Sequence, residues 1–306
     1  VTRPCLDSYK AIILANGLNP KYGVIDPYAM AASSIDEAIR NTIAVGGSLD
    51  RIALLDNFCW GNTDKPDRLG SLMLAAQACY DLAKAYETPF ISGKDSLNNE
   101  YKTETGESIA IPPTLLISAI AVMEDCRKAV TMDLKEPNNL LYAIGTTHNE
   151  MGGSHYFDAL GLTSARIPQV DAKAARALYE ALHRAMDAGL VRSCHDCSEG
   201  GLAVALAEMA FAGGLGVAIN LAQVPRADDV QRDDVILFSE SNSRFIVEIA
   251  PGRQQAFLEA MQGLPVGFLG KIKVTRRLVV TGLQQEVIID CDIAGLKESW
   301  QKTLRW

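Results

Sequence analysis

The chain has 306 residues, a formal net charge of −8, and a composition with 48% hydrophobic and 22% charged residues. These values are typical of a globular protein with a substantial core, and the length accommodates two domains of ordinary size. The acidic balance, without a compensating run of Lys or Arg, argues against a nucleic-acid-binding surface. The apolar stretch 114–123 is too short to span a membrane, and no signal peptide is visible.

The seven cysteines are an odd number and are scattered over helix-like and strand-like segments. This usage predicts free thiols in a reducing, cytoplasmic environment. Cys194 and Cys197 have the C-x-x-C spacing of zinc and dithiol redox sites, but a zinc site needs a second pair of ligands and none is evident. The first residue is Val1, which is compatible with processing or with a piece of a longer polypeptide.

The first half of the chain predicts alternating helices and strands. Asp26 caps a helix that begins at Pro27 and ends at Gly46. A strand over 51–55 and a polar loop over 64–70 follow. A second helix is predicted to bury a face made of Leu69, Leu72, Ala76, Cys79, Tyr80 and Ala83. The remaining elements of this half are a strand over 89–92, a hairpin within 98–108 and a strand over 115–123.

The polar segment 128–139 predicts a domain boundary, with domains over 1–130 and 138–306. Beyond it, the long predicted helix over 172–188 directs Ala175, Leu178, Leu182 and Met186 inward. The other elements predicted there are strands over 140–144, 235–238 and 244–249, a turn over 149–154, helices over 199–211 and 254–261, and a hairpin of 278–280 with 287–289. The predicted fold class is therefore α/β, or α+β, in two tandem units.

The most informative stretch for function is Gly93-Lys94-Asp95-Ser96, directly after the predicted strand 89–92. Glycine permits close backbone approach, and the three side chains after it suit phosphate, metal and a polar substrate. Another hydrophobic strand ends in Asp56-Asn57, and α/β sheets usually form ligand sites where polar groups follow neighbouring strands. The alternative is an ordinary strand-to-loop turn.

Glu37 and Asn41 are a second candidate pair, one helical turn apart and roughly opposite the stripe of Ile35, Ile39 and Ile43. A carboxylate and an amide oxygen on one helix face can share a hard cation such as Mg²⁺. The alternative is a solvated helix face without a ligand.

Asp196 and Ser198 form a third candidate group, just before the predicted helix 199–211. Ser198 can cap that helix, and the free N–H groups at its start favour an anion. The alternative is a purely structural capping motif. His195 lies beside them, but no serine or cysteine nucleophile pattern accompanies it, so a catalytic triad is not expected. A Walker A loop is not expected either, because Thr88 stands where its first glycine would be.

Five motifs together resemble one known family, and they occur in the family's order. They are Asp-Glu-Ala-Ile-Arg-Asn at 36–41, Leu-Asp-Asn-Phe at 55–58, Ser-Gly-Lys-Asp-Ser-Leu at 92–97, His-Asp-Cys-Ser-Glu-Gly-Gly-Leu at 195–202, and Leu-Phe-Ser-Glu-Ser-Asn-Ser-Arg at 237–244. They resemble phosphoribosylformylglycinamidine (FGAM) synthase of purine biosynthesis, specifically its second module similar to aminoimidazole-ribotide (AIR) synthetase. The likeness runs from about Gly17 to the end.

The resemblance implies a ferredoxin-like first domain, whose sheet pairs with a sister module to close a barrel, and a second α/β domain beside an ATP cleft. It also implies the reaction. ATP phosphorylates the formyl amide oxygen of formylglycinamide ribonucleotide (FGAR), and ammonia from a glutaminase domain or subunit displaces the phosphate. ATP and Mg²⁺ are the implied cofactors, since such phosphoryl transfer requires electrostatic stabilisation by metal and lysine.

Within the resemblance, Asp56 and Gly93 match residues that contact the nucleotide, and Ser96 matches one near the substrate. Lys94 stands where short forms of the enzyme often have a metal-binding asparagine. Direct contact of Lys94 with phosphate is therefore the substitute hypothesis.

Glu37, Asn41 and Asp196 resemble metal ligands of an auxiliary nucleotide site found in long forms, and Ser198 resembles a nucleotide contact there. A further carboxylate ligand of that site is not identifiable in this chain, so the auxiliary site is expected to be incomplete.

The first synthetase-like module, with the catalytic histidine it would carry, and a glutaminase nucleophile are not found in the 306 residues, so no catalytic residue is assigned. We therefore expect half of an enzyme, inactive by itself and homodimeric through its uncovered sheet. One alternative is a non-catalytic nucleotide-binding scaffold. Another is a free-standing relative, such as a thiamine-phosphate kinase, selenophosphate synthetase or hydrogenase-maturation protein, although the reactive cysteine segments of such proteins are not evident.

Overall fold

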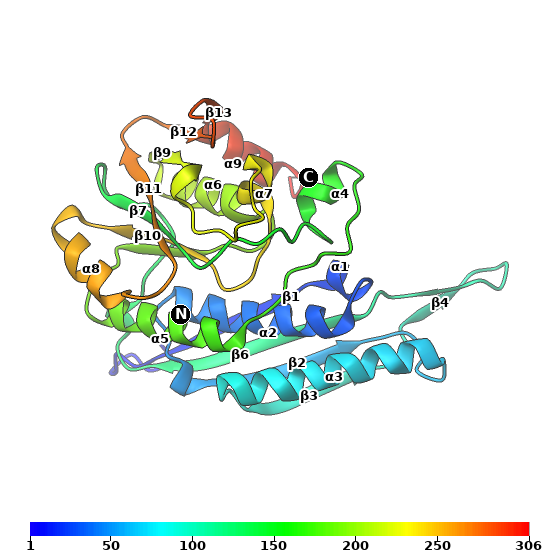
Figure 1. Ribbon diagram of the computed structural model, residues 1–306. Coiled ribbons are helices and arrows are strands. Elements are labelled where there is room, and N and C mark those ends of the chain that lie inside the picture. The colour runs from blue at the N-terminus through cyan, green and yellow to red at the C-terminus, as the bar shows by residue number, and fades with distance from the viewer. Residues whose placement is uncertain (306) are drawn as a thin grey trace. The chain divides into compact units, whose positions relative to one another are not determined.

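The computed structural model describes residues 1–305 (Figure 1). The chain folds as two compact units. Unit 1 comprises 1–43, 47–127 and 152–180, and unit 2 comprises 44–46, 128–151 and the chain from Ala181 onward. The mixed α/β class predicted from the sequence is confirmed. The predicted domain ranges 1–130 and 138–306 stay a prediction.

Unit 1 contains a four-stranded sheet and the helices that cover it. Its elements are β1 (Ala11–Leu18), α1 (Pro20–Gly23), α2 (Pro27–Ala44), a 3₁₀ turn (Leu49–Arg51), β2 (Ile52–Cys59), α3 (Pro66–Tyr86), β3 (Phe90–Ser96), β4 (Glu100–Lys102), β5 (Ser108–Ala110), β6 (Thr114–Met123), α4 (His155–Ala159) and the first part of α5 (Ala172–Asp187). The strand order is β1-β6-β2-β3. β6 is antiparallel to both of its neighbours, whereas β3 is parallel to β2.

α2 begins where the sequence predicts, because Asp26 Oδ1 accepts the N–H groups of Tyr28 and Ala29 at 2.9 and 3.1 Å. The helix lies directly against β1. A Cβ atom at Gly17 would be 2.1 Å from the carbonyl oxygen of Ser34, so only glycine permits this approach of strand and helix.

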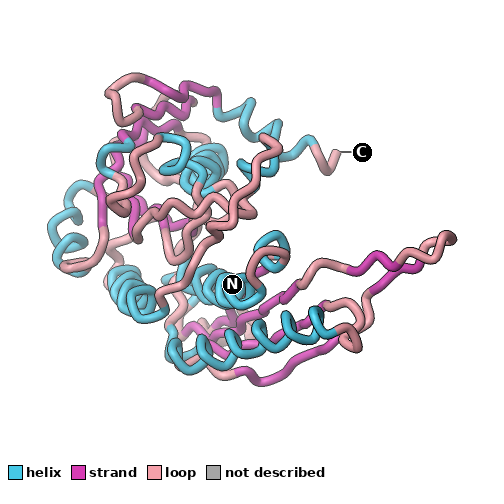
Figure 2. Tube along the Cα trace, turned by 45° about the vertical axis from the view of Figure 1, so that its right-hand side comes forward, coloured by secondary structure: helices cyan, strands magenta, loops and turns pink. Residues whose placement is uncertain are grey.

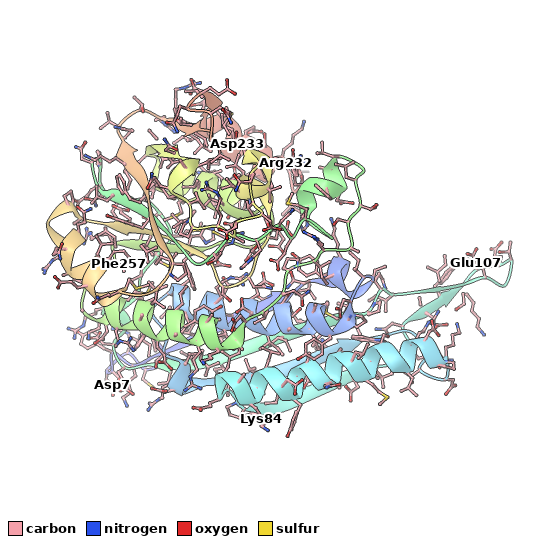
Figure 3. The ribbon with its side chains drawn as sticks, in the orientation of Figure 1. Asp7, Lys84, Glu107, Arg232, Asp233 and Phe257 are labelled. Atoms are coloured by element: carbon pink, nitrogen blue, oxygen red, sulfur yellow. The ribbon has the colours of Figure 1, made fainter. Side chains whose placement is uncertain are left out.

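The hairpin predicted within 98–108 is present as β4–β5, although its second strand extends beyond that segment to Ala110. Figure 2 shows it extending beyond the end of the sheet, with the exposed Glu107 near its tip (Figure 3). Glu100 anchors its base, since this carboxylate accepts the N–H of Asn62 at 2.8 Å and the hydroxyl of Ser108 at 2.5 Å.

The core of unit 1 contains a buried carboxylate, Asp36 on α2, whose exposed fraction is 0%. Arg40 Nη1 donates to its Oδ2 at 2.5 Å, and the hydroxyls of Tyr86 on α3 and Tyr179 on α5 donate to its Oδ1 at 2.7 and 2.5 Å. A buried charge is tolerated only when it is paired and hydrogen-bonded, and Asp36 is both. This one side chain therefore joins three helices of unit 1.

Unit 2 contains a seven-stranded sheet of order β13-β12-β9-β11-β7-β10-β8. Its elements are β7 (Leu140–Ile144), β8 (Ser193–Asp196), α6 (Gly201–Gly213), β9 (Gly216–Asn220), a 3₁₀ turn (Leu221–Gln223), α7 (Asp233–Phe238), β10 (Phe245–Ile249), a 3₁₀ turn (Pro251–Arg253), α8 (Gln254–Ala260), β11 (Val266–Lys273), β12 (Arg277–Thr281), β13 (Val287–Asp292) and α9 (Ile293–Lys302). Every residue of β7 and β10 is buried, so these two strands form the centre of the core.

A second buried carboxylate, Glu248 on β10, fastens the segment that enters unit 2. It accepts the backbone N–H groups of Lys135 and Glu136 at 2.8 and 3.1 Å, the side-chain amide of Asn139 at 2.6 Å and the hydroxyl of Ser193 at 2.9 Å. These four hydrogen bonds stabilise the buried charge.

Three sequence-based predictions of elements were wrong. The segment 235–238 is not a strand but part of α7, because the N–H groups of Ile236 and Ser239 bond the carbonyls four residues earlier. The predicted loop 64–70 contains the start of α3 at Pro66. The buried face of α3 consists of Ala75, Ala78, Cys79, Leu82 and Tyr86, whereas Leu69 and Tyr80 are exposed. Apolar residues lie on more than one face of α3, so spacing alone could not select the buried one.

In the part of the chain that the structure describes, no helix has both the length and the apolar character needed to cross a membrane. The seven cysteines are free thiols.

We expect Tyr179→Phe to lower the free energy of unfolding by about 1–3 kcal/mol, because it removes a hydrogen bond to a buried charge. Urea unfolding followed by circular dichroism measures this loss. Tyr80→Phe is the matched control, since Tyr80 is 63% exposed and its loss should cost less than about 0.5 kcal/mol. Equal stabilities of the two variants would contradict the role given to Asp36.

Candidate functional site

The stretch Gly93-Lys94-Asp95-Ser96 is not a turn. It forms the second half of β3, an edge strand that pairs in parallel with β2. The residues Asp56 and Asn57, predicted to follow a strand, lie within β2. The predicted ligand residues of β2 and β3 are therefore held by strand pairing rather than by a loop.

The pleat of the sheet sends these residues to opposite faces. In the register, Asp56 is opposite Gly93, Asn57 is opposite Lys94, and Cys59 is opposite Ser96. Asp56 alternates with the buried Leu54 and Phe58, so it lies on the face that α2 and α3 cover. Lys94 and Ser96, with Asn57, lie on the opposite face, which we call the outer face.

The side chain of Asp56 fills the space beside Gly93. A Cβ atom at Gly93 would be 2.3 Å from Asp56 Oδ1, so the carboxylate occupies the space that a larger residue would need. The sequence attributed this glycine to close approach of a ligand, whereas the group that approaches it in the structure is a side chain of the neighbouring strand.

Asp56 has a raised pKa. Burial is the larger cause, and the negative charge of Asp95 on the same face raises the pKa further, while a hydrogen bond from the Lys94 backbone N–H acts in the opposite direction. The ionised Asp56 is therefore destabilised in the folded protein, which is typical of residues kept for a function.

On the outer face, Lys94 Nζ donates to Ser96 Oγ at 2.5 Å, and Lys94 is exposed. Polar side chains are more frequent around this pair, and the end of the face farther along the sheet is apolar. The polar residues of the first part, which we call the polar part, are Asn16, Asn57, Ser92, Lys94, Ser96, Thr114 and Ser118, and Leu18, Leu55, Cys59 and Leu116 lie among them on the same face. The residues of the apolar part are Ile12, Leu14, Ala53, Ile120 and Val122, of which Leu14 is 68% exposed.

Glu37 is buried in unit 1 rather than solvated. Its Oε2 accepts the backbone N–H of Leu18 and the side-chain amide of Asn19, both at 2.9 Å, so it fastens α2 to the end of β1. Asn41, one turn later, donates to the carbonyl of Asn16 at 3.3 Å. The structure thus brings this predicted pair together, with contacts to β1 that the sequence did not reveal.

Asp196 and Ser198 lie together in unit 2, at the carboxyl end of β8. The sequence predicted that Ser198 caps α6, and this prediction was wrong. The Ser198 Oγ instead donates to Asp196 Oδ2 at 2.5 Å. The cap position belongs to Gly200, whose left-handed φ of 74° a larger residue would adopt only with strain. Asp196 is buried, with an exposed fraction of 4%.

Two carboxylates around this group were not among the predicted site residues. Glu208 on α6 lies 2.8 Å from His195 Nε2, and Glu240 accepts the N–H of Gly200 at 2.9 Å. Glu240 lies in the motif 237–244, but its contact with Gly200 forms only in the tertiary fold, and no local signal marked Glu208. Burial alone would lower the pKa of His195, but hydrogen bonds and charges from Asp196 and Glu208 raise it to about 9.

The oxygen ligands of Glu37, Asn41 and Asp196 are of the kind that Mg²⁺ prefers. Among residues 1–305, however, no three His, Cys, Asp or Glu side chains are grouped closely enough to hold a metal ion. Burial raises the pKa of Cys194 well above its usual value, and the nearby Asp196 and Cys197 act in the same direction. A thiol in this state is a poor nucleophile and metal ligand.

Comparison with known proteins identifies the two parts of the chain. Residues 5–123 match the family model of the AIR synthase related protein, N-terminal domain, and residues 136–282 match that of its C-terminal domain. The chain belongs to the AIR synthase related family. Both matched domains occur in the order the sequence motifs predicted, and the resemblance to FGAM synthase is confirmed by relatives of that name.

The phosphoribosylformylglycinamidine synthase subunit PurL of Deinococcus radiodurans is 34% identical over 293 residues, which are 94% of this chain and 38% of that protein. The subunit PurL of Methanocaldococcus jannaschii is 31% identical over 292 residues, 94% of this chain and 39% of that protein. This AIR synthase related chain therefore spans about two-fifths of the length of these relatives.

Solved structures of Thermotoga maritima PurL have the same fold. The structure complexed with FGAR has a TM-score of 0.79 at 20% identity and covers 95% of this chain and 46% of that chain. The structure complexed with ATP has a TM-score of 0.75 at 19% identity and covers 94% of this chain and 44% of that chain. At such identities the likeness concerns the fold alone.

We expect Asp56→Asn to stabilise the chain at neutral pH and not in acid. Because the folded-state pKa of Asp56 is raised above its unfolded value of 3.8, the folded wild type binds the proton more tightly, and its stability falls as pH rises through this window. Asparagine carries no charge and avoids this loss. The melting temperature of the Asp56→Asn variant should therefore exceed that of the wild type by about 1–3 °C at pH 7. Unfolding curves between pH 4 and 7 measure the difference, and a difference that does not grow with pH would refute the explanation.

Gly93→Ala should destabilise the chain by about 1–3 kcal/mol, because the new Cβ collides with Asp56. The same substitution in an Asp56→Ala background should cost clearly less, since the colliding carboxylate is gone. Urea unfolding of the four proteins of this double-mutant cycle gives the coupling. An equal cost in both backgrounds would contradict the proposed collision with Asp56.

Proposed function

We propose that the chain is the second AIR-synthetase-like module of an FGAM synthase, and that together with a first module it carries out ATP-dependent amidation of FGAR. In this reaction ATP phosphorylates the amide oxygen, and ammonia from a glutaminase domain or subunit replaces the phosphate, giving FGAM, ADP and phosphate. The similarity to PurL subunits over 94% of the chain but about two-fifths of their length supports the assignment to one module.

The observation that carries the proposal is the composition of the outer face of the unit 1 sheet. Its polar part presents the ammonium group of Lys94 beside the hydroxyl of Ser96. A cation with hydroxyl donors suits the phosphates of ATP and of a phosphorylated substrate. Asp56 and Gly93 lie on the opposite face of the same two strands, and they are proposed to contact the nucleotide at this edge of the sheet.

The apolar part of the same face is the proposed contact with the sister module. Leu14 is 68% exposed and Val122 39%, although they stand in a regular strand array. Large apolar side chains grouped on one face of a soluble protein usually mark an interface. In the isolated chain we propose that a second copy takes the place of the sister module and forms a homodimer.

Mg²⁺ is proposed to accompany ATP and to neutralise phosphate charge. Its proposed ligands are Glu37 and Asn41 in unit 1 and Asp196 in unit 2, where Ser198 is a proposed nucleotide contact. The oxygen chemistry of these side chains supports this part of the proposal. A cytoplasmic location is part of the proposal too, and the seven free thiols support it.

The test is FGAM formation from FGAR, ATP and ammonia. The chain alone should give no turnover, and addition of a first module from a PurL relative should produce it.

In the complete enzyme, Lys94→Ala should lower kcat/KM by about 100-fold, since it removes the positive charge that faces the reacting phosphate. Turnover by the chain alone would overturn the half-enzyme assignment. Tight retention of nucleotide through purification, with no turnover after addition of the first module, would favour the scaffold alternative.

The dimer has its own test. Sedimentation should show a dimer for the chain and a monomer for Leu14→Lys, because a charge at the apolar part of the outer face must lose its hydration on pairing. Leu69→Lys is the matched control, since Leu69 on α3 is 44% exposed and outside this face. A monomeric wild type would contradict the proposed use of the face.

A further inference from the structure

Four side chains of unit 2 form a continuous polar chain that ends at Ser198. Glu208 Oε2 lies 2.8 Å from His195 Nε2, and His195 Nδ1 lies 3.4 Å from Asp196 Oδ1. The other carboxylate oxygen of Asp196, Oδ2, accepts the Ser198 hydroxyl at 2.5 Å. Glu208 belongs to α6, His195 and Asp196 to β8, and Ser198 to the loop that joins them.

The geometry restrains Asp196 from two sides. Its side chain is 4% exposed, and each of its oxygens faces a different partner, an imidazole nitrogen at Oδ1 and a hydroxyl at Oδ2. Rotation of the carboxylate would break one of these contacts. The imidazole is in turn restrained, because its other nitrogen contacts Glu208, whose side chain is 22% exposed.

The order of the groups excludes a nucleophilic triad. A triad needs the imidazole next to the hydroxyl, so that the ring can take its proton. Here the Asp196 carboxylate stands between His195 and Ser198, with the ring at its Oδ1 and the hydroxyl at its Oδ2. The order of these four side chains is therefore not the one that activates a serine nucleophile.

We propose that Glu208 and His195 are positioning residues, which hold Asp196 and Ser198 in the orientation that binds a magnesium-bound nucleotide. The proposal rests on the proposed function, in which Asp196 and Ser198 contact that ligand. Carboxylates that bind metal ions are commonly held by hydrogen bonds from neighbouring side chains, and loss of such outer partners typically weakens metal affinity by about 10–100-fold.

The test compares Glu208→Ala with Glu208→Gln in the full 306-residue chain. Titration calorimetry with magnesium ADP should show about tenfold weaker binding for Glu208→Ala. Glu208→Gln keeps an acceptor oxygen for His195, so it should retain most of the affinity. Glu259→Ala on α8 is the control for loss of an exposed glutamate from a helix of the same unit, and its affinity should equal that of the wild type.

Melting temperatures distinguish a positioning role of Glu208 from a purely structural one. If Glu208 only ties α6 to β8, Glu208→Ala lowers the melting temperature and leaves the affinity unchanged, which would overturn the proposal. Reduced affinity in Glu208→Ala with recovery in Glu208→Gln, at similar melting temperatures, supports it.

A crystal structure of the Glu208→Ala variant tests the positioning of Asp196 independently of nucleotide binding. If the wild type binds no magnesium ADP, the assigned function of Asp196 and Ser198 fails, and the structure still decides whether Glu208 positions them. A rotated Asp196 carboxylate with a broken contact to Ser198 supports positioning. Retention of the 2.5 Å contact between Ser198 Oγ and Asp196 Oδ2 in the variant overturns it.

Discussion

Side chains alternate between two faces along every strand, and in unit 1 helices cover only one face of the sheet. This constraint decides what each residue of β2 and β3 can do. Asp56 and Gly93 are directed toward the helices, where the carboxylate fills the space above the glycine. Lys94 and Ser96, one and three residues after Gly93, are directed outward beside an apolar surface. A motif that is continuous in the sequence is thus divided between the two faces of the sheet, while Gly93, Lys94 and Asp95 all remain exposed at the edge strand.

Buried carboxylates organise both units by accepting many hydrogen bonds. Asp36 joins α2, α3 and α5, and Glu248 fastens the segment that enters the second sheet. Glu37 and Asp196, which the sequence marked as metal ligands, are also held by donors of the protein. In each case several donors offset the cost of burying the charge. A structural role and a ligand role are compatible in such residues, because a ligand group must first be held in place.

Much of the fold could be predicted from local patterns. The helix that begins at Pro27 has a capping aspartate and a stop at glycine, and both act through neighbouring backbone groups. The hairpin of β12 and β13 and the strand β10 follow from apolar runs between turn residues. The failures occurred where local patterns are ambiguous. The apolar run 235–238 is compatible with a strand or a short helix. Only the backbone hydrogen bonds to carbonyls four residues earlier show that it belongs to the helix α7.

The sequence by itself determined the family, the two-part α/β architecture and the segments that carry the candidate residues, because ordered motifs and periodic apolar positions are local properties. Only the tertiary structure decided which of those residues share a face. It also supplied the partners Glu208 and Glu240, which come from distant parts of the chain. Strand register, helix packing and burial depend on contacts between segments far apart in sequence, and no local pattern specifies them.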